Sequence, residues 1–548
     1  MRSQNPRRAS LLLALVGLGP AAILARDSAS FSVKIPALEV VDASDPIDPS
    51  FCGFAFEQAS FVRYAQDDNG KPNAFSNNLI RAVTSRTGGA PIIRLGGTSP
   101  DYGRYLPGQE EPALPVAEQD NYQNIGFTTI GPSYWALTRN FPGAKYMVQV
   151  PLATTNVSET VAWAQSAVEG IGLENIHSIQ PGNEADLYAD DFYGEGGIEL
   201  NPPEYQGTLT NETYVGNWTK YVDAILAAVD LPKDRLFSAF DVAAHVGDDA
   251  HEDAYVFDVE TCFKLCIDAR GIIKDVSHHY YQRQAGTAAD LASGLMNTTT
   301  THNHLDQFRR HVEWLKENQP GIPFVLNEVG NSLFRTNSYA FQARLGSALW
   351  QADFYLYAAA AVGVARVNYQ QIMHAGYDLW LPVASAGVAP QVFANFYSQP
   401  FVADFLGWPS DTQKTRTGTR AAKLDITGDS SVPPNLAVYA AYEGNEASRI
   451  AVTNLDYWNL TSSGWERPSV TLQLQVPRDV QVVTVYHLNS PLGAGAAADS
   501  ITYGGSQWTY ESLGEEVRDV RNDTEQIAVE NGVVGVTVQS SEAVLVWL

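Results

Sequence analysis

The chain has 548 residues, which is more than one compact hydrophobic core needs, and this predicts a large domain with a smaller one. Its hydrophobic fraction of 45% and aromatic fraction of 11% are typical of a folded globular protein. The formal net charge of -26, without any basic run, argues against binding to nucleic acid or to an anionic membrane surface.

The N-terminal segment 1–25 has the pattern of a secretory signal peptide. Arginines precede an apolar run at 11–24, and small residues follow at Ala25, where we expect cleavage. An uncleaved membrane anchor is the alternative, but the run is short for a span and contains glycines and a proline. We therefore expect a secreted, extracellular protein with no membrane segment after cleavage.

The asparagine sequons fit a secreted protein. Six Asn-x-Ser/Thr sequons are candidates for N-glycosylation and lie at Asn156, Asn211, Asn217, Asn297, Asn459 and Asn522. The three cysteines are too few for a disulfide framework. Cys262 and Cys266 could bridge within one turn, whereas a metal site would need further ligands beside them. Cys52, in a hydrophobic strand, is most simply a buried thiol.

From about residue 50 to 400, short apolar runs alternate with amphipathic helical stretches, which is typical of repeated βα units. Apolar residues recur every three or four positions at 305–317 and at 218–229, and each pattern predicts a helix with one buried face. Eight strands are predicted, at 51–56, 91–95, 146–152, 176–180, 236–241, 275–280, 323–327 and 364–369. Eight βα units in a row predict a (β/α)8 TIM barrel over 46–405, with its active site at the C-terminal strand ends.

After residue 410 the chain alternates apolar and polar residues without helical stretches. Strands predicted at 436–442, 470–476, 480–486, 533–538 and 542–548 indicate an antiparallel β-sandwich domain over 410–548. The segment 26–45 also contains an alternating run, and we expect it to join this domain. The predicted fold class is thus α/β, a barrel with an appended β-sandwich.

Two glutamates follow asparagines where predicted strands end. Glu184 comes after the fourth barrel strand and Glu328 after the seventh. Two carboxyl groups about 5 Å apart, one protonated and one ionised, are what a retaining glycoside hydrolase needs. A glutamate in a loop is more often just a solvated charge, but the strand positions favour a catalytic pair.

The motifs Arg-Leu-Gly-Gly-Thr at 94–98, Gly-Asn-Glu at 182–184, His-His-Tyr-Tyr at 278–281 and Asn-Glu at 327–328 resemble glycoside hydrolase family 79 of clan A. That family contains heparanase and the β-glucuronidases, and its β-domain is made from both chain ends. The resemblance covers nearly all of the mature chain. It implies that Glu184 is the general acid/base, that Glu328 is the nucleophile, and that Asn183 bonds the 2-hydroxyl of the sugar.

The nucleophile must stay ionised. Arg94 could supply a charge-assisted hydrogen bond to Glu328, and Tyr280 could donate its hydroxyl to the same carboxylate. Arg94 could instead be the structural partner of another buried carboxylate. His278 and His279 would point to opposite faces of a strand, so we expect one of them to be a core residue and not both to be ligands.

Fewer residues point to the recognition of the sugar than to the catalytic pair. Glu57, at the end of the first strand, could bond sugar hydroxyls or form a salt bridge. In heparanase-like members a tyrosine and a glycine run after the nucleophile bind the uronate carboxylate, and this chain has no tyrosine at 329–335. Arg335 could pair with that carboxylate, or Tyr377 could contribute a hydroxyl.

The expected function is an exo-acting β-glucuronidase of glycans, with 4-O-methyl-glucuronate as one candidate sugar. An enzyme that cleaves sulfated heparan within the chain needs basic residues around its active site. This chain has 61 acidic against 35 basic residues, which disfavours heparan as the substrate. The alternatives are a clan A β-glycosidase of neutral sugars and a non-catalytic carbohydrate-binding cell-wall protein. No metal or other cofactor is implied, because protonation and carboxylate attack suffice. The sequence does not indicate the oligomeric state.

Overall fold

The computed structural model describes residues 29–38, 42–118, 125–188, 206–207, 209–232, 234–243, 257–283, 291–332, 338–374, 377–407, 418–428 and 430–548. The predicted signal peptide at 1–25 and the candidate Arg335 lie outside these residues. Within them, no helix combines the length and the apolar character that crossing a membrane requires.

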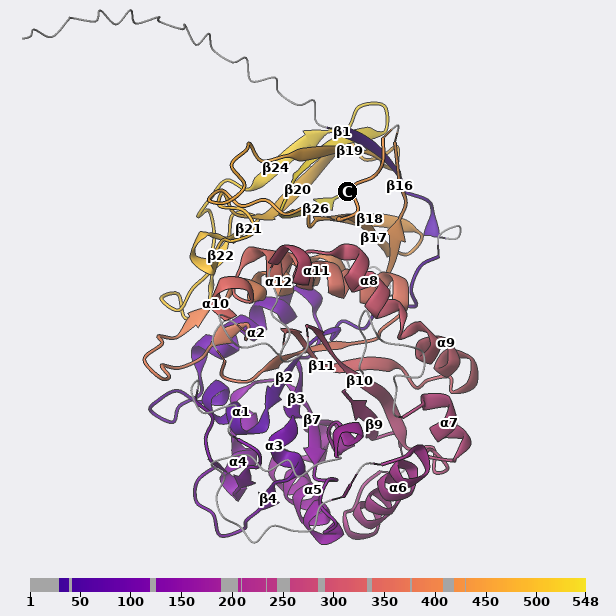
Figure 1. Ribbon diagram of the computed structural model, residues 1–548, viewed down its shortest axis with the longest axis vertical. Coiled ribbons are helices and arrows are strands. Elements are labelled where there is room, and N and C mark those ends of the chain that lie inside the picture. Colours follow the sequence, from indigo (N-terminus) through magenta and orange to yellow (C-terminus); the bar gives the residue numbers. More distant parts are fainter. Residues whose placement is uncertain are drawn as a thin grey trace, which may run out of the picture.

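Eight parallel strands close into a barrel in chain order (Figure 1). They are β2 (Cys52–Glu57), β3 (Ile92–Gly96), β7 (Lys145–Val150), β8 (Ile176–Pro181), β9 (Phe237–Val242), β10 (Ile273–Arg283), β11 (Phe324–Ser332) and β12 (Val367–Gln371). Each overlaps one predicted strand, and the predicted TIM barrel is confirmed. The strands have apolar sequences because helices cover their outer face and side chains fill the interior.

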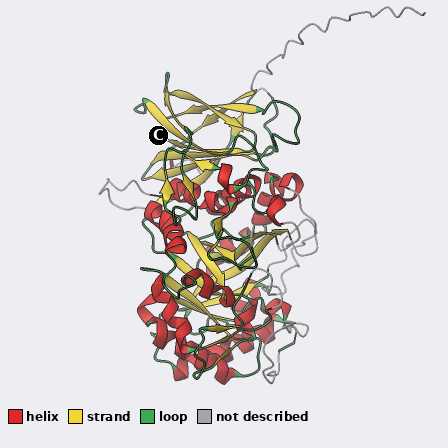
Figure 2. Ribbon diagram, turned by 90° about the vertical axis from the view of Figure 1, so that its left-hand side faces the viewer, coloured by secondary structure: helices red, strands yellow, loops and turns green. Residues whose placement is uncertain are grey.

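The helices that follow the barrel strands in sequence surround the barrel or separate it from the second domain (Figure 2). They are α1 (Gln58–Ala65), α2 (Ala74–Thr87), α3 (Thr98–Asp101), α4 (Pro132–Ala136), α5 (Val157–Ile171), α6 (Asn211–Ala228), α7 (Val259–Lys264), α8 (Thr298–Asp306), α9 (Arg309–Asn318), α10 (Ser338–Phe341), α11 (Leu345–Tyr357) and α12 (Ser398–Leu406). The single helix predicted at 305–317 is wrong, because the chain bends between α8 and α9. There the backbone N–H groups of Gln307 and Phe308 bond three residues back, which is tighter than an α-helix.

The second domain packs two sheets around its own apolar core. Its strands are β1 (Ala29–Lys34), β15 (Thr419–Leu424), β16 (Ile426–Thr427), β17 (Leu436–Glu443), β18 (Glu446–Asn454), β19 (Ser469–Gln475), β20 (Val482–Asn489), β21 (Thr502–Tyr503), β24 (Thr524–Ala528), β25 (Val533–Gln539) and β26 (Glu542–Trp547). The N-terminal strand β1 lies in this domain and pairs in parallel with β19, while the remaining described pairs are antiparallel. Both ends of the chain thus contribute to one sandwich.

Short strands form smaller sheets beside these two units. They are β4 (Arg104–Tyr105), β5 (Ala113–Leu114), β6 (Thr129–Ile130), β13 (Trp380–Leu381), β14 (Gln391–Val392), β22 (Gln507–Trp508) and β23 (Glu516–Val517). Cys52 and Cys262 are buried thiols and Cys266 is an exposed one, so the bridge between Cys262 and Cys266 is absent.

Helices α8, α11 and α12 lie between the barrel and the sandwich (Figure 1). Asp353 on α11 accepts hydrogen bonds from Tyr439 of β17 at 2.7 Å and Thr453 of β18 at 2.8 Å. Its other oxygen lies 2.9 Å from Nε2 of His302 on α8. These four residues, the domain-contact cluster, tie the barrel to the sandwich through buried polar groups.

Candidate active site

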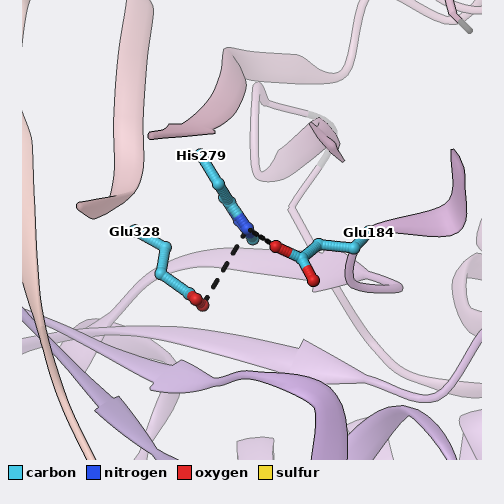
Figure 3. Close-up of side chains that lie close together, drawn as sticks. All are labelled: Glu184, His279 and Glu328. Atoms are coloured by element: carbon cyan, nitrogen blue, oxygen red, sulfur yellow. Dashed lines mark hydrogen bonds and ion pairs between the residues drawn. The ribbon is translucent and has the colours of Figure 1, made fainter. Parts of the chain in front are cut away.

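Glu184 and Glu328 face each other at the C-terminal end of the barrel, with His279 of β10 between them (Figure 3). Nδ1 of His279 lies 2.9 Å from Glu184 Oε1 and 3.9 Å from Glu328 Oε2. The nearest carboxyl oxygens of the two glutamates are within 4.8 Å of each other. This separation suits a carboxylate that attacks the sugar directly, because an inverting pair leaves room for a water and stands roughly 6.5–9.5 Å apart.

The backbone turns sharply at Glu184. The residue has a φ of 47°, in the left-handed region, and Gly182 before it has a φ of 87°. The N–H of Glu184 donates to the carbonyl of Asp241 at 2.7 Å, and the N–H of Asn183 donates to the carboxylate of Asp101 at 3.1 Å. The turn is therefore held from both sides and directs the Glu184 carboxyl into the barrel mouth.

Asp101, at the end of α3, was not predicted from the sequence. It is buried, and its carboxylate also accepts from the N–H of Leu152 at 2.8 Å and from the hydroxyl of Tyr188. Burial raises the pKa of Asp101 to about 6, although these donors oppose the shift. Only the folded chain brings the donors together, so no local motif could have identified this residue.

Arg94 lies fully buried in β3 and bridges the two catalytic segments. Its Nη1 is 2.5 Å from Glu328 Oε2 and its Nη2 is 2.6 Å from Asn183 Oδ1. Gly96 leaves room for this side chain, because a Cβ there would lie 2.8 Å from the Arg94 Cζ. This bond occupies Oδ1 and fixes the orientation of the Asn183 amide, so that its NH2 group is the part that can donate to a bound sugar.

The predicted contact of Tyr280 with Glu328 is wrong, and Tyr281 takes that place. The Tyr281 hydroxyl donates to Glu328 Oε1, whereas the Tyr280 hydroxyl contacts Gln282 and lies 3.0 Å from Nδ1 of His304. Side chains alternate along a strand, so Tyr281 shares the inner face of β10 with His279 while Tyr280 points outward to the helices.

The two adjacent histidines have different surroundings. His278 packs against Phe308, His311 and Phe324 on the outer face, and burial holds its pKa well below the usual value. His279 is fully buried too, but the neighbouring carboxylates, Glu328 first, outweigh burial and raise its pKa to about 9. One histidine is thus a core residue, as expected, and the other lies at the centre of the site.

Glu328 is held in its ionised form. Burial alone would raise its pKa, but the charges of His279 and Arg94 and the hydroxyl of Tyr281 outweigh this and lower the pKa below its usual value. Glu184 is more open, with 18% of its side chain exposed against 8% for Glu328. The site therefore has one enclosed, ionised carboxylate and one that solvent or a substrate can reach.

The spacing of Glu184, His279 and Glu328 would also suit a metal ion. However, the guanidinium of Arg94 already contacts Glu328, and the raised pKa of His279 favours the imidazolium form, which cannot bind a metal. Both features oppose a cation at this position.

Other candidates lie around this centre. Glu57 is buried, and its carboxylate accepts hydrogen bonds from the N–H groups of Ala59 at 2.7 Å and Ser99 at 3.2 Å. It therefore caps the N-terminus of α1 and forms no salt bridge within the described chain. Burial raises its pKa to about 7. Tyr377 lies over Gly330, where a Cβ would be 2.3 Å from its hydroxyl oxygen, and its ring is 6.3 Å from that of Tyr281.

Comparisons with known proteins agree over both parts of the chain. The sequence model of the glycosyl hydrolase family 79 C-terminal beta domain matches residues 438–545. A β-glucuronidase of Aspergillus niger is 28% identical over 95% of this chain and 94% of its own length. A β-glucuronidase of Neurospora crassa is 26% identical over 82% of both chains. These matches confirm the resemblance to glycoside hydrolase family 79.

Solved structures share the fold. The crystal structure of a 4-O-α-L-rhamnosyl-β-D-glucuronidase from Fusarium oxysporum superposes with a TM-score of 0.75 at 21% identity, covering 95% of this chain and 100% of that one. A family 51 arabinofuranosidase from Xanthomonas axonopodis pv. citri gives a TM-score of 0.59 at 15% identity, with coverage of 94% and 99%. The barrel with its β-domain is therefore an architecture shared beyond one family.

Proposed function

We propose that this relative of the family 79 β-glucuronidases is a retaining, exo-acting β-glucuronidase that releases a terminal uronic acid from glycans by double displacement. The observation that carries the proposal is the facing pair of glutamates within 4.8 Å, one enclosed and ionised and the other open to the barrel mouth. The two β-glucuronidase relatives match most of the chain and support the choice of sugar.

In the first step the Glu328 carboxylate attacks the anomeric carbon while the bond to the aglycone oxygen breaks. Glu184 gives its proton to that oxygen, and the sugar becomes an ester of Glu328. Arg94 and Tyr281 hold the attacking carboxylate in place. The NH2 group of Asn183 is oriented to bond the sugar 2-hydroxyl, a contact that strengthens as the anomeric carbon gains positive charge.

In the second step Glu184, now ionised, takes a proton from water, and the water oxygen attacks the anomeric carbon. The ester bond breaks, the Glu328 carboxylate is restored, and the sugar leaves with the configuration it had in the substrate. Two inversions at one carbon thus give net retention, without any group beyond these side chains and water.

For recognition of the uronate carboxylate we propose two residues, Tyr377 and Arg335. Tyr377 lies next to the Tyr281 that contacts the nucleophile, which supports a role for its hydroxyl in that subsite. Arg335 remains a candidate outside the described residues. Replacing Tyr377 by Phe should raise KM for a glucuronide and leave KM for a glucoside unchanged, because only the uronate has the carboxylate.

We also propose that the protein is secreted and N-glycosylated. The signal-peptide pattern at 1–25 supports secretion, and Asn522 presents an exposed sequon side chain. Expression in a eukaryotic host should give a secreted product that starts after Ala25 and loses mass on treatment with an N-glycosidase. An intracellular product with an intact N-terminus would contradict this proposal.

The test of function is an assay of the purified protein on chromogenic β-glucuronide, its 4-O-methyl derivative and β-glucoside. We expect turnover of a glucuronide that collapses in Glu184→Gln and Glu328→Gln, and NMR should show the β-anomer as the first product. Turnover of the glucoside alone would support the neutral-sugar alternative. Binding of glycans without turnover of any substrate would support the non-catalytic one.

A further inference from the structure

Two bulges flank β10 at the level of His279. On one side Ser277 pairs with Phe240 and His278 with Val242, which leaves Asp241 as an extra residue in β9. On the other side His278 pairs with Leu326 and His279 with Glu328, which leaves Asn327 as an extra residue in β11. Bulges are rare in parallel sheets and tend to re-aim side chains next to active sites.

The backbone of β9 is strained at its bulge. Phe240 has a φ of 79° and Asp241 a φ of 45°, two consecutive non-glycine residues in the left-handed region. L-residues rarely adopt this conformation, so the rest of the fold must stabilise it. Its result is that the Asp241 side chain enters the barrel instead of following the alternation of the strand.

The two extra residues contact each other inside the barrel. Asn327 Nδ2 donates to Asp241 Oδ1 at 2.9 Å, and Ser238 Oγ donates to Asp241 Oδ2 at 3.1 Å. Arg366 Nη2 donates to Asn327 Oδ1 at 3.2 Å, which fixes the orientation of the amide. All of these side chains are buried. The position of the Asp241 carboxylate is therefore set by neighbouring protein groups and not by water.

His279 completes the chain of contacts toward the catalytic carboxyl. Its Nε2 has no hydrogen-bond partner among the described residues and faces Asp241 Oδ1 at 3.7 Å. Its Nδ1 lies 2.9 Å from Glu184 Oε1. The imidazole thus stands between a buried carboxylate with fixed contacts and the carboxyl that handles the proton in catalysis.

We propose that Asp241 is a positioning residue for the acid/base: it keeps a proton on Nε2 of His279, so that Nδ1 is the nitrogen that shares a proton with Glu184. This inference rests on the proposed function, since it assigns a role within that reaction. In a neutral imidazole with its lone pair on Nε2, that lone pair would face the Asp241 carboxylate and be repelled by it. An Nε2–H group in the same place is attracted to the carboxylate. A carboxylate orients the histidine of a serine hydrolase triad by the same principle.

The charges around the imidazole support the same arrangement. It faces Glu184 after β8, Asp241 on β9, Glu328 on β11 and Arg94 on β3, which are three carboxyl groups and one guanidinium. Glu184 gives up its own proton to the leaving oxygen in the first step, and the Nδ1–H group of the imidazolium, which keeps its proton, then donates to the carboxylate that remains. In the second step the same carboxylate takes a proton from water, which returns the pair to its starting state.

The first test is Asp241→Asn, which keeps the shape and removes the charge. We expect the alkaline limb of the kcat/KM profile to move to lower pH by about one unit, because an opposite charge near an imidazolium is removed. We also expect a large loss of kcat/KM with a poor leaving group such as 4-methoxyphenol, and little loss with 2,4-dinitrophenol, whose departure needs no proton.

The matched control is Asp353→Asn, which changes a buried aspartate beside a histidine in the domain-contact cluster. It should change neither the alkaline limb nor the dependence on the leaving group. Equal losses with both leaving groups in Asp241→Asn would overturn the proposal and leave Asp241 a purely structural residue.

A second measurement needs no catalytic activity. The 15N shifts of the histidine rings in the wild-type protein, with His279 assigned from a His279→Gln spectrum, should show Nε2 protonated throughout and Nδ1 titrating. An unprotonated Nε2 at any pH where the protein is folded would overturn the proposal. If instead the spectrum agrees and no glucuronide is turned over, the proposed function fails and the proton assignment stands.

Discussion

Two buried pairs of aspartate and histidine show how this protein separates stability from chemistry. In the domain-contact cluster, Asp353 lies 2.9 Å from His302, and its other oxygen accepts from two hydroxyl groups. In the barrel mouth, Asp241 lies 3.7 Å from His279, whose Nε2 has no hydrogen bond within the described chain. The same two residue types form a satisfied contact in one place and an unsatisfied one in the other.

The backbones differ in the same way. Asp353 lies within the regular helix α11, whereas Asp241 lies in a bulge with positive φ angles. A satisfied network on regular backbone rigidifies a fold, and strain with an incompletely bonded polar group is tolerated where it has a catalytic use. The predictions below separate the two regions, from the largest expected effect to the smallest.

Replacing Glu328 by Gln should give the largest loss of activity. The amide cannot attack the anomeric carbon, and we expect kcat to fall by at least about 10⁴-fold. Steady-state kinetics on an activated glucuronide measures this. An activity within tenfold of wild type would exclude Glu328 as the nucleophile, and the circular dichroism spectrum would verify that the variant is folded.

Arg94→Met tests what keeps the nucleophile ionised. Without the guanidinium the pKa of Glu328 should rise, so the acid limb of kcat/KM moves to higher pH by about 1–3 units and the rate falls about 100-fold. Arg94→Lys is the matched control, because it restores the charge without the forked geometry. It should recover the acid limb and only part of the rate; an unchanged acid limb in Arg94→Met would contradict the assigned role.

Gly330→Ala tests the wall of the site with a single methyl group. The added Cβ would lie 2.3 Å from the Tyr377 hydroxyl oxygen and 2.7 Å from Tyr281 Cε1, so both rings must move. Displacing the donor to Glu328 should lower kcat/KM by about tenfold to 100-fold. Gly216→Ala is the control, since nothing lies within 4 Å of its Cβ in helix α6. It should leave kinetics unchanged.

Asp353→Asn should reduce stability and leave kcat nearly unchanged, which is the reverse of the catalytic cluster. Losing the buried charge-assisted bonds should lower the free energy of unfolding by about 1–3 kcal/mol at pH 7. Burial would raise the pKa of Asp353, but His302, Tyr439 and Thr453 outweigh it and lower the pKa. A lowered pKa in the folded state stabilises the protein above the unfolded value of about 3.9, and this stability is lost as pH falls through the folded value.

Urea unfolding at several pH values measures this effect. The difference between wild type and Asp353→Asn should be constant above about pH 4 and should shrink below it. A difference that grows as the pH falls would contradict the assignment of Asp353 as an ionised contact. A kcat reduced more than tenfold would show that the two regions are coupled.

The sequence predicted the parts of the site that lie on regular strands. The eight apolar runs predicted the barrel strands, and because parallel strands in a barrel end at one rim, Glu184, Glu328 and Arg94 could be brought together without coordinates. Alternation along β10 also put His279 and Tyr281 on one face, but it could not say which face was inside. The choice of Tyr280 over Tyr281 was wrong for that reason.

What the sequence determined by itself was the order of the elements, the barrel, the β-domain and the two glutamates, because these depend on periodicity and on short local motifs. Only the tertiary structure decided the positions of Asp241, Asp101 and Asn327. A bulge shifts the strand by one residue and reverses which side chain points inward, and no local pattern records that shift. The proton-handling part of the site therefore depends on register, which packing between neighbouring strands sets.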